Sequence, residues 1–546
     1  MTYRILVTDN VHEKGIELLR RRSNFRVDIE NSLSAHDLQK VIGEYHGLVL
    51  RGATKVTADV LAAASRLKVI GRAGAGVDNV DVAEATRRGV VVMNVPGGNA
   101  VATAEHTIGL IMAAHRHIAQ ATLSMKSGKW EKKKFQGREI TGRILGVIGL
   151  GKVGSLVAKL AVRGLKMEVL GYDPAIAPDV LAQLGVKPAS LDAIFSRSDV
   201  VTVHTLLNEE TRGLINKAAF SKMKDGVIIV NCARGGIVDE TALLAGLESG
   251  RVSAAALDVF SVSPPGEHPL VMHPNVIATP HLGASTGEAQ VNVAVGVIDQ
   301  MIDFLEKGII TNAVNVPAID PALSHKMWPY LDLARRLGQF IGGFASGVIT
   351  DMQVIYTGEI ASWDVKPVTN AAILGLLSSS EGSDVNFVNA AVTARNRGIR
   401  VSETTLEESG ANGPVLEIRV GLATGPRLSV QGALIRRIGH EPRIIGIGNF
   451  VTEAVPAGPM LIVTNRDVPG MIAGISGALA ADDINIGQMN LSRDRIGGSA
   501  MSIINIDASA SEHTLNKIRS IQGILSVKQV VLDEPASSKP GSGIIS

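Results

Sequence analysis

Two side chains that could carry out an oxidation stand directly after apolar runs near the middle of the chain. Arg234 follows a run that ends at Asn231, and His281 follows Thr279-Pro280. A guanidinium can hold a carboxylate through two parallel hydrogen bonds, and an imidazole with a pKa near neutrality can accept a hydroxyl proton. Taken alone, each is more often structural, as an arginine on a loop or a histidine that caps a helix. Together they fit the oxidation of a hydroxy acid.

A glycine-rich turn provides a place for the cofactor of such a reaction. Gly149-Leu150-Gly151-Lys152-Val153-Gly154 lies between the apolar run 144–148 and the helical stretch 155–163, and Asp173 ends the next apolar run. Gly149, Gly151 and Gly154 allow a tight turn whose N–H groups approach a pyrophosphate, while an acid about 20 residues later accepts the ribose hydroxyls. An empty βα turn is the alternative. The full order of strand, glycines, helix, strand and acid predicts a dinucleotide site, and Asp173 favours NAD over NADP because it would repel a 2′-phosphate.

The elements that position these groups are predicted to be α/β. Short apolar runs alternate with amphipathic stretches, which is typical of parallel sheets and indicates two doubly wound, Rossmann-like domains. We expect residues 1–98 and 284–317 to form a substrate-binding domain into which an NAD-binding domain, residues 99–283, is inserted. Arg234 and His281 would then lie at the carboxyl edge of that inserted sheet, where ligands bind.

The second half of the chain predicts two further units. Residues 318–452 mix helical and strand-like segments and are expected to form an α/β intervening domain. Residues 459–532 follow the order β-α-β-β-α-β, which is ferredoxin-like. Residues 533–546 are rich in Ser, Gly and Pro, so we expect a disordered tail.

Composition excludes several other classes. Lys and Arg total 54 against 52 acids, and no basic run rich in aromatics occurs, so nothing predicts a nucleic-acid partner. No uncharged run reaches the ~18 residues of a membrane span, and the N-terminal residues resemble a short strand rather than a secretory signal. A single cysteine, Cys232, rules out an internal disulfide framework. We expect a cytoplasmic protein with no membrane association and no metal.

Five segments resemble the D-isomer-specific 2-hydroxyacid dehydrogenases. They are residues 145–154, 171–174 (GYDP), 231–236 (NCARGG), 256–260 (ALDVF) and 279–286 (TPHLGAST). More narrowly, four other segments are similar to the long-form members that act on 3-phosphoglycerate at the first step of serine biosynthesis: residues 72–79, 94–99, 104–107 and 128–135. The resemblance covers the whole chain. It implies NAD-dependent oxidation of 3-phospho-D-glycerate to 3-phosphohydroxypyruvate, and it implies that the ferredoxin-like unit is an ACT regulatory domain.

The resemblance also implies roles for individual residues. Arg234 would bind the substrate carboxylate and polarise the C2 oxygen, while His281 takes the hydroxyl proton. Asp173 would hold the adenosine ribose. Residues at the family's other NAD contacts, besides the glycines of the motif, are Ala75, Lys152, Val153, Thr205, Cys232, Ala233, Arg234, Asp258, His281 and Gly283. Cys232 is therefore interpreted as a backbone contact rather than a nucleophile.

The phosphate end of the substrate needs further cations. The candidates are Arg51, Arg72, Lys132 and Lys133, the two lysines reaching across from a second subunit as in similar enzymes. A solvated charge run is the alternative for the lysines. Asn99 and the backbone at Gly74 are better placed to hold the carboxylate.

One position departs from the family pattern. The family pairs its histidine with a glutamate shortly after the LDVF segment, where this chain has Ser263. A carboxylate would orient the imidazole and stabilise its charged form, so its loss lowers the pKa of His281 by ~1 to 3 units. We therefore predict a shifted pH profile and reduced activity, unless Glu267 or Asp258 substitutes.

This departure leaves other functions open. A weakly active fold that binds NAD(H) could act as a redox-sensing interaction protein, and a related enzyme could act on another 2-hydroxy acid such as glycerate or lactate. Arg234, His281 and the substrate-side cations favour an enzyme over a sensor.

Regulation and assembly are also implied. By resemblance to ACT domains, serine would bind at Asn465, Asp467 and Asn485, although a plain β-turn would use the same Asp-x-Pro-Gly letters. The apolar stretch 108–112 and the partner-supplied lysines favour a homodimer, and ACT pairing favours a homotetramer.

Overall fold

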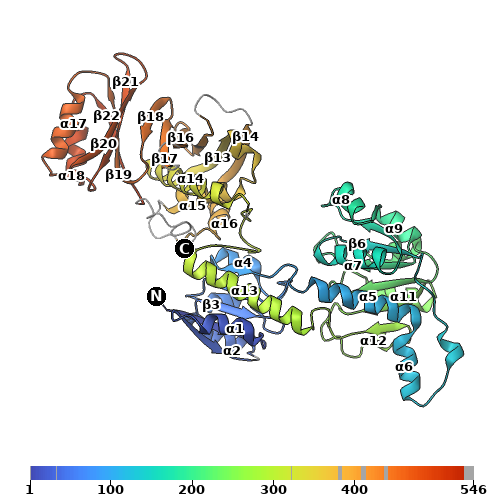
Figure 1. Cartoon of the computed structure of the whole chain (residues 1–546). Coiled ribbons are helices and arrows are strands. Elements are labelled where there is room, and N and C mark those ends of the chain that lie inside the picture. The colour runs from blue at the N-terminus through green and yellow to red at the C-terminus, as the bar shows by residue number, and fades with distance from the viewer. Residues whose placement is uncertain are drawn as a thin grey trace.

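The computed structural model describes residues 2–31, 33–320, 322–378, 384–406, 413–435 and 441–533. Four sheets of five, seven, six and four strands organise these residues. The predicted mixed α/β class with parallel Rossmann-like sheets is confirmed (Figure 1). The predicted tail, apart from its first residue Asp533, lies outside the described residues.

The N-terminal unit is a parallel sheet of order β2-β1-β3-β4-β5. Its strands are β1 (Tyr3–Val7), β2 (Phe25–Ile29), β3 (Gly47–Leu50), β4 (Val69–Arg72) and β5 (Val91–Met93). Its helices are α1 (Glu13–Arg20), α2 (Ala35–Val41), η1 (Ile42–Glu44), α3 (Ala58–Ala63) and α4 (Val82–Arg87). The much later helix α13 (Gly287–Lys307) returns to this sheet: Met301 leaves no room for a side chain at Gly71.

The inserted unit is a parallel seven-stranded sheet of order β12-β11-β10-β9-β6-β7-β8. Its strands are β6 (Ile144–Ile148), β7 (Glu168–Tyr172), β8 (Lys187–Pro188), β9 (Val200–Val203), β10 (Val227–Asn231), β11 (Val252–Leu257) and β12 (Val276–Ala278). Its helices are α5 (Ala100–Arg116), α6 (Ile118–Lys126), η2 (Lys132–Phe135), α7 (Lys152–Arg163), α8 (Pro178–Gln183), α9 (Leu191–Arg197), α10 (Lys217–Lys222), α11 (Glu240–Glu248) and α12 (Pro269–Met272).

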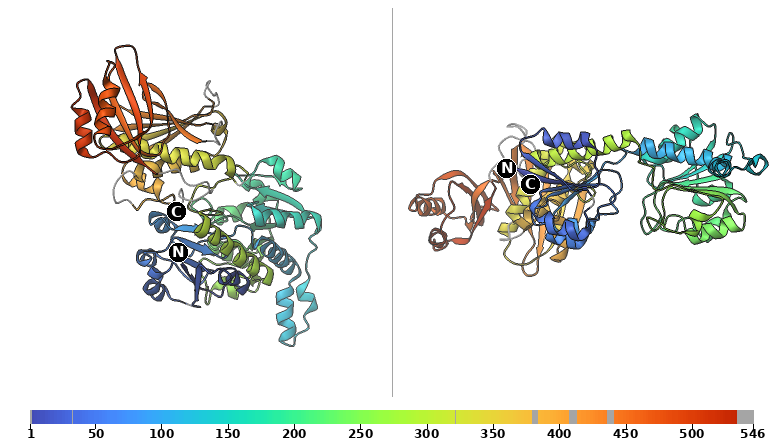
Figure 2. Two further views of the ribbon diagram at one scale, coloured as in Figure 1. Left: turned by 60° about the vertical axis from the view of Figure 1, so that its left-hand side comes forward. Right: turned by 90° about the horizontal axis from the view of Figure 1, so that it is seen from below.

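Two consecutive helices, α5 and α6, follow residue 99. His117 adopts a left-handed conformation (φ 51°), which ends α5 and starts α6 in a new direction. Figures 1 and 2 show α6 and the segment after it projecting from the inserted unit.

The third unit has a mixed sheet of order β14-β13-β15-β16-β17-β18, with β13 and β14 parallel and the other pairs antiparallel. Its strands are β13 (Ile349–Thr357), β14 (Arg400–Leu406), β15 (Leu416–Leu422), β16 (Leu428–Ile435), β17 (Glu441–Ile447) and β18 (Phe450–Ala454). Its helices are α14 (Ser324–Phe344), η3 (Gly358–Ser362), α15 (Lys366–Ser378) and α16 (Ala390–Asn396).

The C-terminal unit is an antiparallel sheet of order β20-β21-β19-β22 with two helices. In chain order it comprises β19 (Gly458–Arg466), α17 (Met471–Ala480), β20 (Ile486–Arg493), β21 (Ser499–Ile506), α18 (Glu512–Arg519) and β22 (Ile524–Leu532). The predicted βαββαβ order is confirmed. Figure 2 places this unit at one end of an elongated molecule and the inserted unit at the other.

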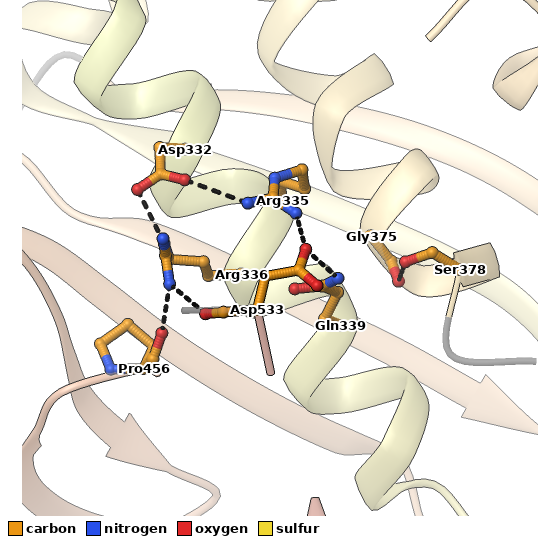
Figure 3. Close-up of polar contacts among 8 residues, drawn as sticks. All are labelled: Asp332, Arg335, Arg336, Gln339, Gly375, Ser378, Pro456 and Asp533. Carbon is orange, nitrogen blue, oxygen red and sulfur yellow. Dashed lines mark hydrogen bonds and ion pairs between the residues drawn. The ribbon is translucent and has the colours of Figure 1, made fainter. Parts of the chain in front are cut away.

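Two arginines of α14 attach the C-terminal unit to the third unit (Figure 3). Arg336, whose side chain is 3% exposed, donates to Asp332 Oδ2 at 2.7 Å and to the carbonyls of Pro456 and Asp533 at 2.9 Å each. Arg335 and Gln339 bind the Asp533 carboxylate. Burial alone would raise the pKa of Asp533, but the hydrogen bonds from Gln339 and Arg335 hold it below its usual range. The end of β22 is therefore fixed on α14 by charge-assisted hydrogen bonds.

Replacing Arg336 with methionine is expected to destabilise this half of the molecule by about 3 to 5 kcal/mol, because it leaves the Asp332 carboxylate and the carbonyls of Pro456 and Asp533 without their buried donor. Urea unfolding followed by tryptophan fluorescence measures the loss, since Trp328 and Trp363 both pack against the third unit's core. Arg427→Met is the matched control, because Arg427 is 64% exposed in its pair with Asp351 and should contribute below about 1 kcal/mol. Equal losses in the two variants would contradict the prediction.

Candidate active site

Two adjoining cavities lie between the N-terminal and inserted units. The larger, about 860 Å³, takes most of its wall from the N-terminal unit and includes Arg51, Arg72 and Gly74. The smaller, about 170 Å³, is lined mainly by the inserted unit. Asn99, His281 and Ala284 line both cavities. The imidazole therefore stands at the boundary between a substrate-sized space and the carboxyl edge of the inserted sheet.

Three basic residues, Arg51, Lys55 and Arg72, line the larger cavity beside the carboxylates of Asp78 and Asp81, and Arg72 at the end of β4 is the best placed to bind an anion. Its guanidinium lies so close to Gly74 that a Cβ there would fall 1.5 Å from Nη1. Burial, reinforced by the charge of Arg234, lowers the pKa of Arg72 to about 10. Arg72 Nε is buried and has no hydrogen-bond partner among the described residues. A partly buried guanidinium with a free donor is suited to bind an anion.

Arg51 shares the wall of this cavity, and its backbone N–H donates to Asp9 Oδ2 at 3.0 Å. Lys55 also lines the cavity and was not among the predicted site residues. Its place four residues after Arg51, beyond the end of β3, could have indicated it. Lys132 and Lys133, by contrast, lie on η2 beyond the projecting α6 and line neither cavity.

Arg234 is held by the end of β10. The Asn231 side chain donates to the carbonyl of Arg234 at 2.9 Å and accepts from the N–H of Ala233 at 3.0 Å. The guanidinium reaches across to the N-terminal unit, where Nε donates to Asp78 Oδ2 at 2.9 Å and Nη2 fills the space beside Gly76. A substrate carboxylate would therefore meet a cation already placed in the cleft.

The glycine-rich turn has the shape that a pyrophosphate needs. Gly149 has φ 88°, and a Cβ at Gly154 would fall 2.0 Å from the Gly149 carbonyl. A Cβ at Gly151, which precedes α7, would meet nothing within 4 Å, so the N-terminus of this helix is open. Asp173 Oδ2 accepts from the N–H of Leu150 at 2.8 Å, which fixes the acid next to the turn. Lys152 Nζ donates across the cleft to the Pro96 carbonyl at 3.0 Å.

The smaller cavity brings together most of the other predicted cofactor contacts. Its lining includes Ala75, Val153, Thr205, Cys232, Ala233, Arg234, Asp258 and Gly283. Thr205 Oγ1 is buried without a hydrogen-bond partner among the described residues, as expected for a group that meets a ligand. Burial raises the pKa of Cys232 to about 12, so its thiol is not a nucleophile at neutral pH.

His281 follows β12 in a left-handed conformation with φ 56°. Its backbone N–H donates to the carbonyls of Asp258 at 3.1 Å and Thr279 at 3.0 Å. Within the described ranges, its imidazole forms no hydrogen bond. Burial lowers the pKa of His281, and the positive charges of Arg234 and Arg72 lower it further. The negative charge of Asp258 acts in the opposite direction and raises the pKa.

Ser263 lines the same cavity as His281, and neither predicted substitute pairs with the imidazole. Glu267 is exposed and forms no hydrogen bond or ion pair with any described residue. The Asp258 carboxylate contributes negative charge, but its oxygens bind the loop that carries His281. The pKa of His281 is lowered, but its burial is the main cause, so the predicted effect of Ser263 stays a prediction.

Replacing Ser263 with glutamate is expected to raise the pKa of His281 by ~1 unit or more and to increase turnover. Oxidation needs the neutral imidazole, so its acid limb should move to higher pH. Reduction needs the protonated form, so that activity should persist to higher pH. Rates measured in both directions against pH test this, with Ser263→Gln as the uncharged control. An unchanged profile and rate would show that the serine is harmless.

Each of the three predicted regulatory residues forms its hydrogen bond with a different partner. The Asn465 amide donates to the Arg466 carbonyl at 2.7 Å, Asp467 accepts from the N–H of Gly497 at 3.0 Å, and Asn485 donates to Asp507 at 2.9 Å. No hydrogen bond joins any two of the three. Asn465 Oδ1 is buried and has no partner among the described residues.

Three family models match the chain in the order of its units. They are the D-isomer specific 2-hydroxyacid dehydrogenase NAD binding domain over residues 108–283, the D-3-phosphoglycerate dehydrogenase intervening domain over 326–448 and the ACT domain over 460–523. A D-3-phosphoglycerate dehydrogenase of Synechocystis is 41% identical over 95% of this chain and 93% of its own length. That of Archaeoglobus fulgidus is 39% identical over 97% of this chain and 100% of its own length.

The chain belongs to the D-3-phosphoglycerate dehydrogenase family.

Solved structures in the wider dehydrogenase family match a little over half of this family member. A D-lactate dehydrogenase of Aquifex aeolicus in complex with NAD and lactic acid is 26% identical, with a TM-score of 0.51 over 57% of this chain and all of that one. A glyoxylate reductase of Paecilomyes thermophila is 29% identical, with a TM-score of 0.53 over 57% of this chain and 98% of that one.

As a member of the family, the chain is an NAD-dependent oxidoreductase with an ACT domain. No helix in the described ranges combines the length and apolar character that crossing a membrane requires. The described side chains also contain no group of three His, Cys, Asp or Glu that could hold a metal ion.

Proposed function

We propose that this chain oxidises 3-phospho-D-glycerate to 3-phosphohydroxypyruvate with NAD, as the first step of serine biosynthesis. The observation that carries this proposal is the cluster of three cations, Arg51, Lys55 and Arg72, in the cavity that His281 also lines. A phosphorylated acid needs cations at both ends, whereas lactate needs them at one. Relatives that match nearly the full length and are named for this reaction support the same substrate.

In this mechanism, Arg234 holds the substrate carboxylate and polarises the C2 oxygen. Neutral His281 accepts the proton of the C2 hydroxyl, and bound NAD supplies the acceptor for the hydride that leaves C2. Asn99 and the backbone at Gly74 help to hold the carboxylate. The phosphate extends toward Arg51, Lys55 and Arg72, the last of which has an unused donor.

The cofactor is held by the glycine-rich turn and its neighbours. The N–H groups at the start of α7 face the pyrophosphate, and Asp173 accepts hydrogen bonds from the adenosine ribose. Thr205 and the backbone around Cys232 line the nicotinamide side.

A substrate panel tests the proposal. Wild-type protein is assayed for NADH formation with 3-phosphoglycerate, glycerate and lactate, with hydrazine present to trap the 2-oxo product. We expect kcat/KM for 3-phosphoglycerate to exceed that for the other two by at least 10²-fold. A preference for glycerate or lactate would assign another 2-hydroxy acid. NADH binding without turnover of any of the three would favour the redox-sensing alternative.

The exposed surface of α6 and the segment after it supports a homodimer formed through that surface. The stretch 108–112 packs partly into the core of the inserted unit, with Ile111 fully buried, and offers little interface. By contrast, apolar side chains on α6 and after it are exposed: Leu123 at 68%, Met125 at 55% and Trp130 at 79%. Covering this surface with a second copy would bring Lys132 and Lys133 near the partner's cleft. Light scattering of wild type and Trp130→Ser tests the dimer, and further pairing of ACT domains would give a tetramer.

Serine binding at the ACT domain is the proposed regulation. Asn465, Asp467 and Asn485 offer amide and carboxylate groups that an amino acid's ammonium would meet, and the unpaired Asn465 Oδ1 supports this assignment. Titrating serine into the assay tests the proposal. A flat response up to millimolar serine would remove it.

A further inference from the structure

The Asp258 carboxylate is the centre of a hydrogen-bond cluster directly behind His281. The residue is 1% exposed. Oδ1 accepts from Thr279 Oγ1 at 2.6 Å and from the N–H of Leu282 at 2.7 Å, and Oδ2 accepts from the N–H of Gly283 at 2.8 Å. These contacts hold the loop on both sides of His281, so the direction of the imidazole depends on where Asp258 lies.

Helix α5 holds this cluster from the opposite side. His106 Nε2 lies 3.2 Å from Asp258 Oδ1 and 3.3 Å from Thr279 Oγ1. One turn earlier, Thr103 Oγ1 donates to the Gly283 carbonyl at 3.1 Å. The same helix begins in the cleft, directly after Asn99. One rigid helix therefore links a cavity residue to both ends of the His281 loop.

The loop needs this support for two reasons. His281 has φ 56°, a conformation that a residue with a Cβ avoids unless its surroundings enforce it. In addition, no described carboxylate accepts a hydrogen bond from its imidazole, because Ser263 occupies the position where the family has a glutamate. The orientation of the ring is left to the backbone of the loop.

We propose that His106 is a positioning residue for hydride transfer, which orders the His281 loop by donating a hydrogen bond from Nε2 to Asp258. The proposal rests on the role of His281 in the proposed function. Burial would raise the pKa of Asp258, yet hydrogen bonds from His106 and Thr279 keep it below its usual range, so the carboxylate is an acceptor. His106 is 21% exposed at its side chain and does not line either cavity, so it acts through the loop rather than on substrate.

Three single variants separate positioning from general stability. His106→Ala removes the donor, and His106→Gln keeps an N–H donor on a side chain of similar reach. Glu105→Ala is the matched control, one residue earlier on α5 and exposed. For each, kcat and KM for 3-phosphoglycerate, the Kd for NADH by fluorescence, and Tm are measured.

We expect His106→Ala to lower kcat about 10- to 100-fold, because small misplacements of a catalytic group have effects of that size. The KM for 3-phosphoglycerate and the Kd for NADH should change less than about 3-fold, and His106→Gln should recover most of the rate. An unchanged kcat in His106→Ala would overturn the proposal. So would a Gln variant as slow as Ala, or a parallel loss of NADH binding and Tm, which would indicate a structural role.

Amide hydrogen exchange gives a readout that does not need turnover. The N–H groups of Leu282 and Gly283 both donate to Asp258, so His106→Ala should speed their exchange while Glu105→Ala leaves it unchanged. Faster exchange in the His106→Ala variant would support the ordering of the loop by His106 even if the wild-type protein turned over no 2-hydroxy acid, a result that would reject the proposed function. Unchanged exchange in His106→Ala would reject the ordering of the loop by His106, whatever the activity.

Discussion

Replacing His281 with asparagine is expected to lower kcat for the oxidation of 3-phosphoglycerate by about 10² to 10⁴-fold, because the C2 hydroxyl loses its proton acceptor. Asparagine tolerates the left-handed backbone that His281 adopts, so the loop should keep its conformation. Binding of NADH should remain within a few-fold of wild type, since the glycine-rich turn is untouched.

The pH profile sharpens this prediction. In the wild type, kcat/KM should fall as His281 becomes protonated, and the lowered pKa of His281 should place that fall below the usual histidine range. The neutral form therefore predominates at pH 7, and this acid limb should be absent from the residual activity of the asparagine variant.

His117→Asn is the matched control, because His117 is also left-handed (φ 51°) but lies at the junction of α5 and α6. Its rate and pH profile should equal those of wild type. An asparagine variant of His281 that keeps more than a tenth of the wild-type kcat would mean that another group accepts the proton.

Replacing Arg234 with alanine is expected to lower kcat/KM for 3-phosphoglycerate by about 10² to 10³-fold, because the carboxylate and the C2 oxygen lose a common donor. Both kcat and KM should change, since the guanidinium contacts the ground state and the developing charge. Arg234→Lys keeps the charge but not the planar fork, so it should recover only part of the loss.

Steady-state kinetics of the two Arg234 variants measure these effects. Arg251→Ala is the control, because Arg251 pairs with Asp225 on the surface of the same unit, away from the cleft. If the lysine variant matched wild type, charge alone would suffice and the bidentate contact would be wrong. If only Tm fell, the arginine would be a structural bridge to Asp78.

Sequence patterns were sufficient to predict an element or a site wherever its residues are close together along the chain. The glycine-rich turn, the acid that follows it and the βαββαβ order depend on spacings of a few residues to a few tens, which local backbone preferences express directly. Arg234 and His281 could also be chosen in advance, because the carboxyl ends of parallel strands meet at one edge of a sheet. For the same reason Arg51, Arg72, Gly74 and Asn99 could be expected in one cavity.

Contacts between distant segments were decided only by packing. His106 and Asp258 are 152 positions apart, and only the placement of α5 against the inserted sheet brings them within 3.2 Å. Asp258 was predicted as a cofactor contact; the structure adds that its oxygens hold the His281 loop, which no local pattern reveals.

The left-handed turn at His117 sends Lys132 and Lys133 away from the cavities of their own chain. Arg335 meets Asp533 across 198 positions for the same reason: side-chain pairing at a domain junction depends on how rigid units dock, and hydrophobic periodicity carries no information about that.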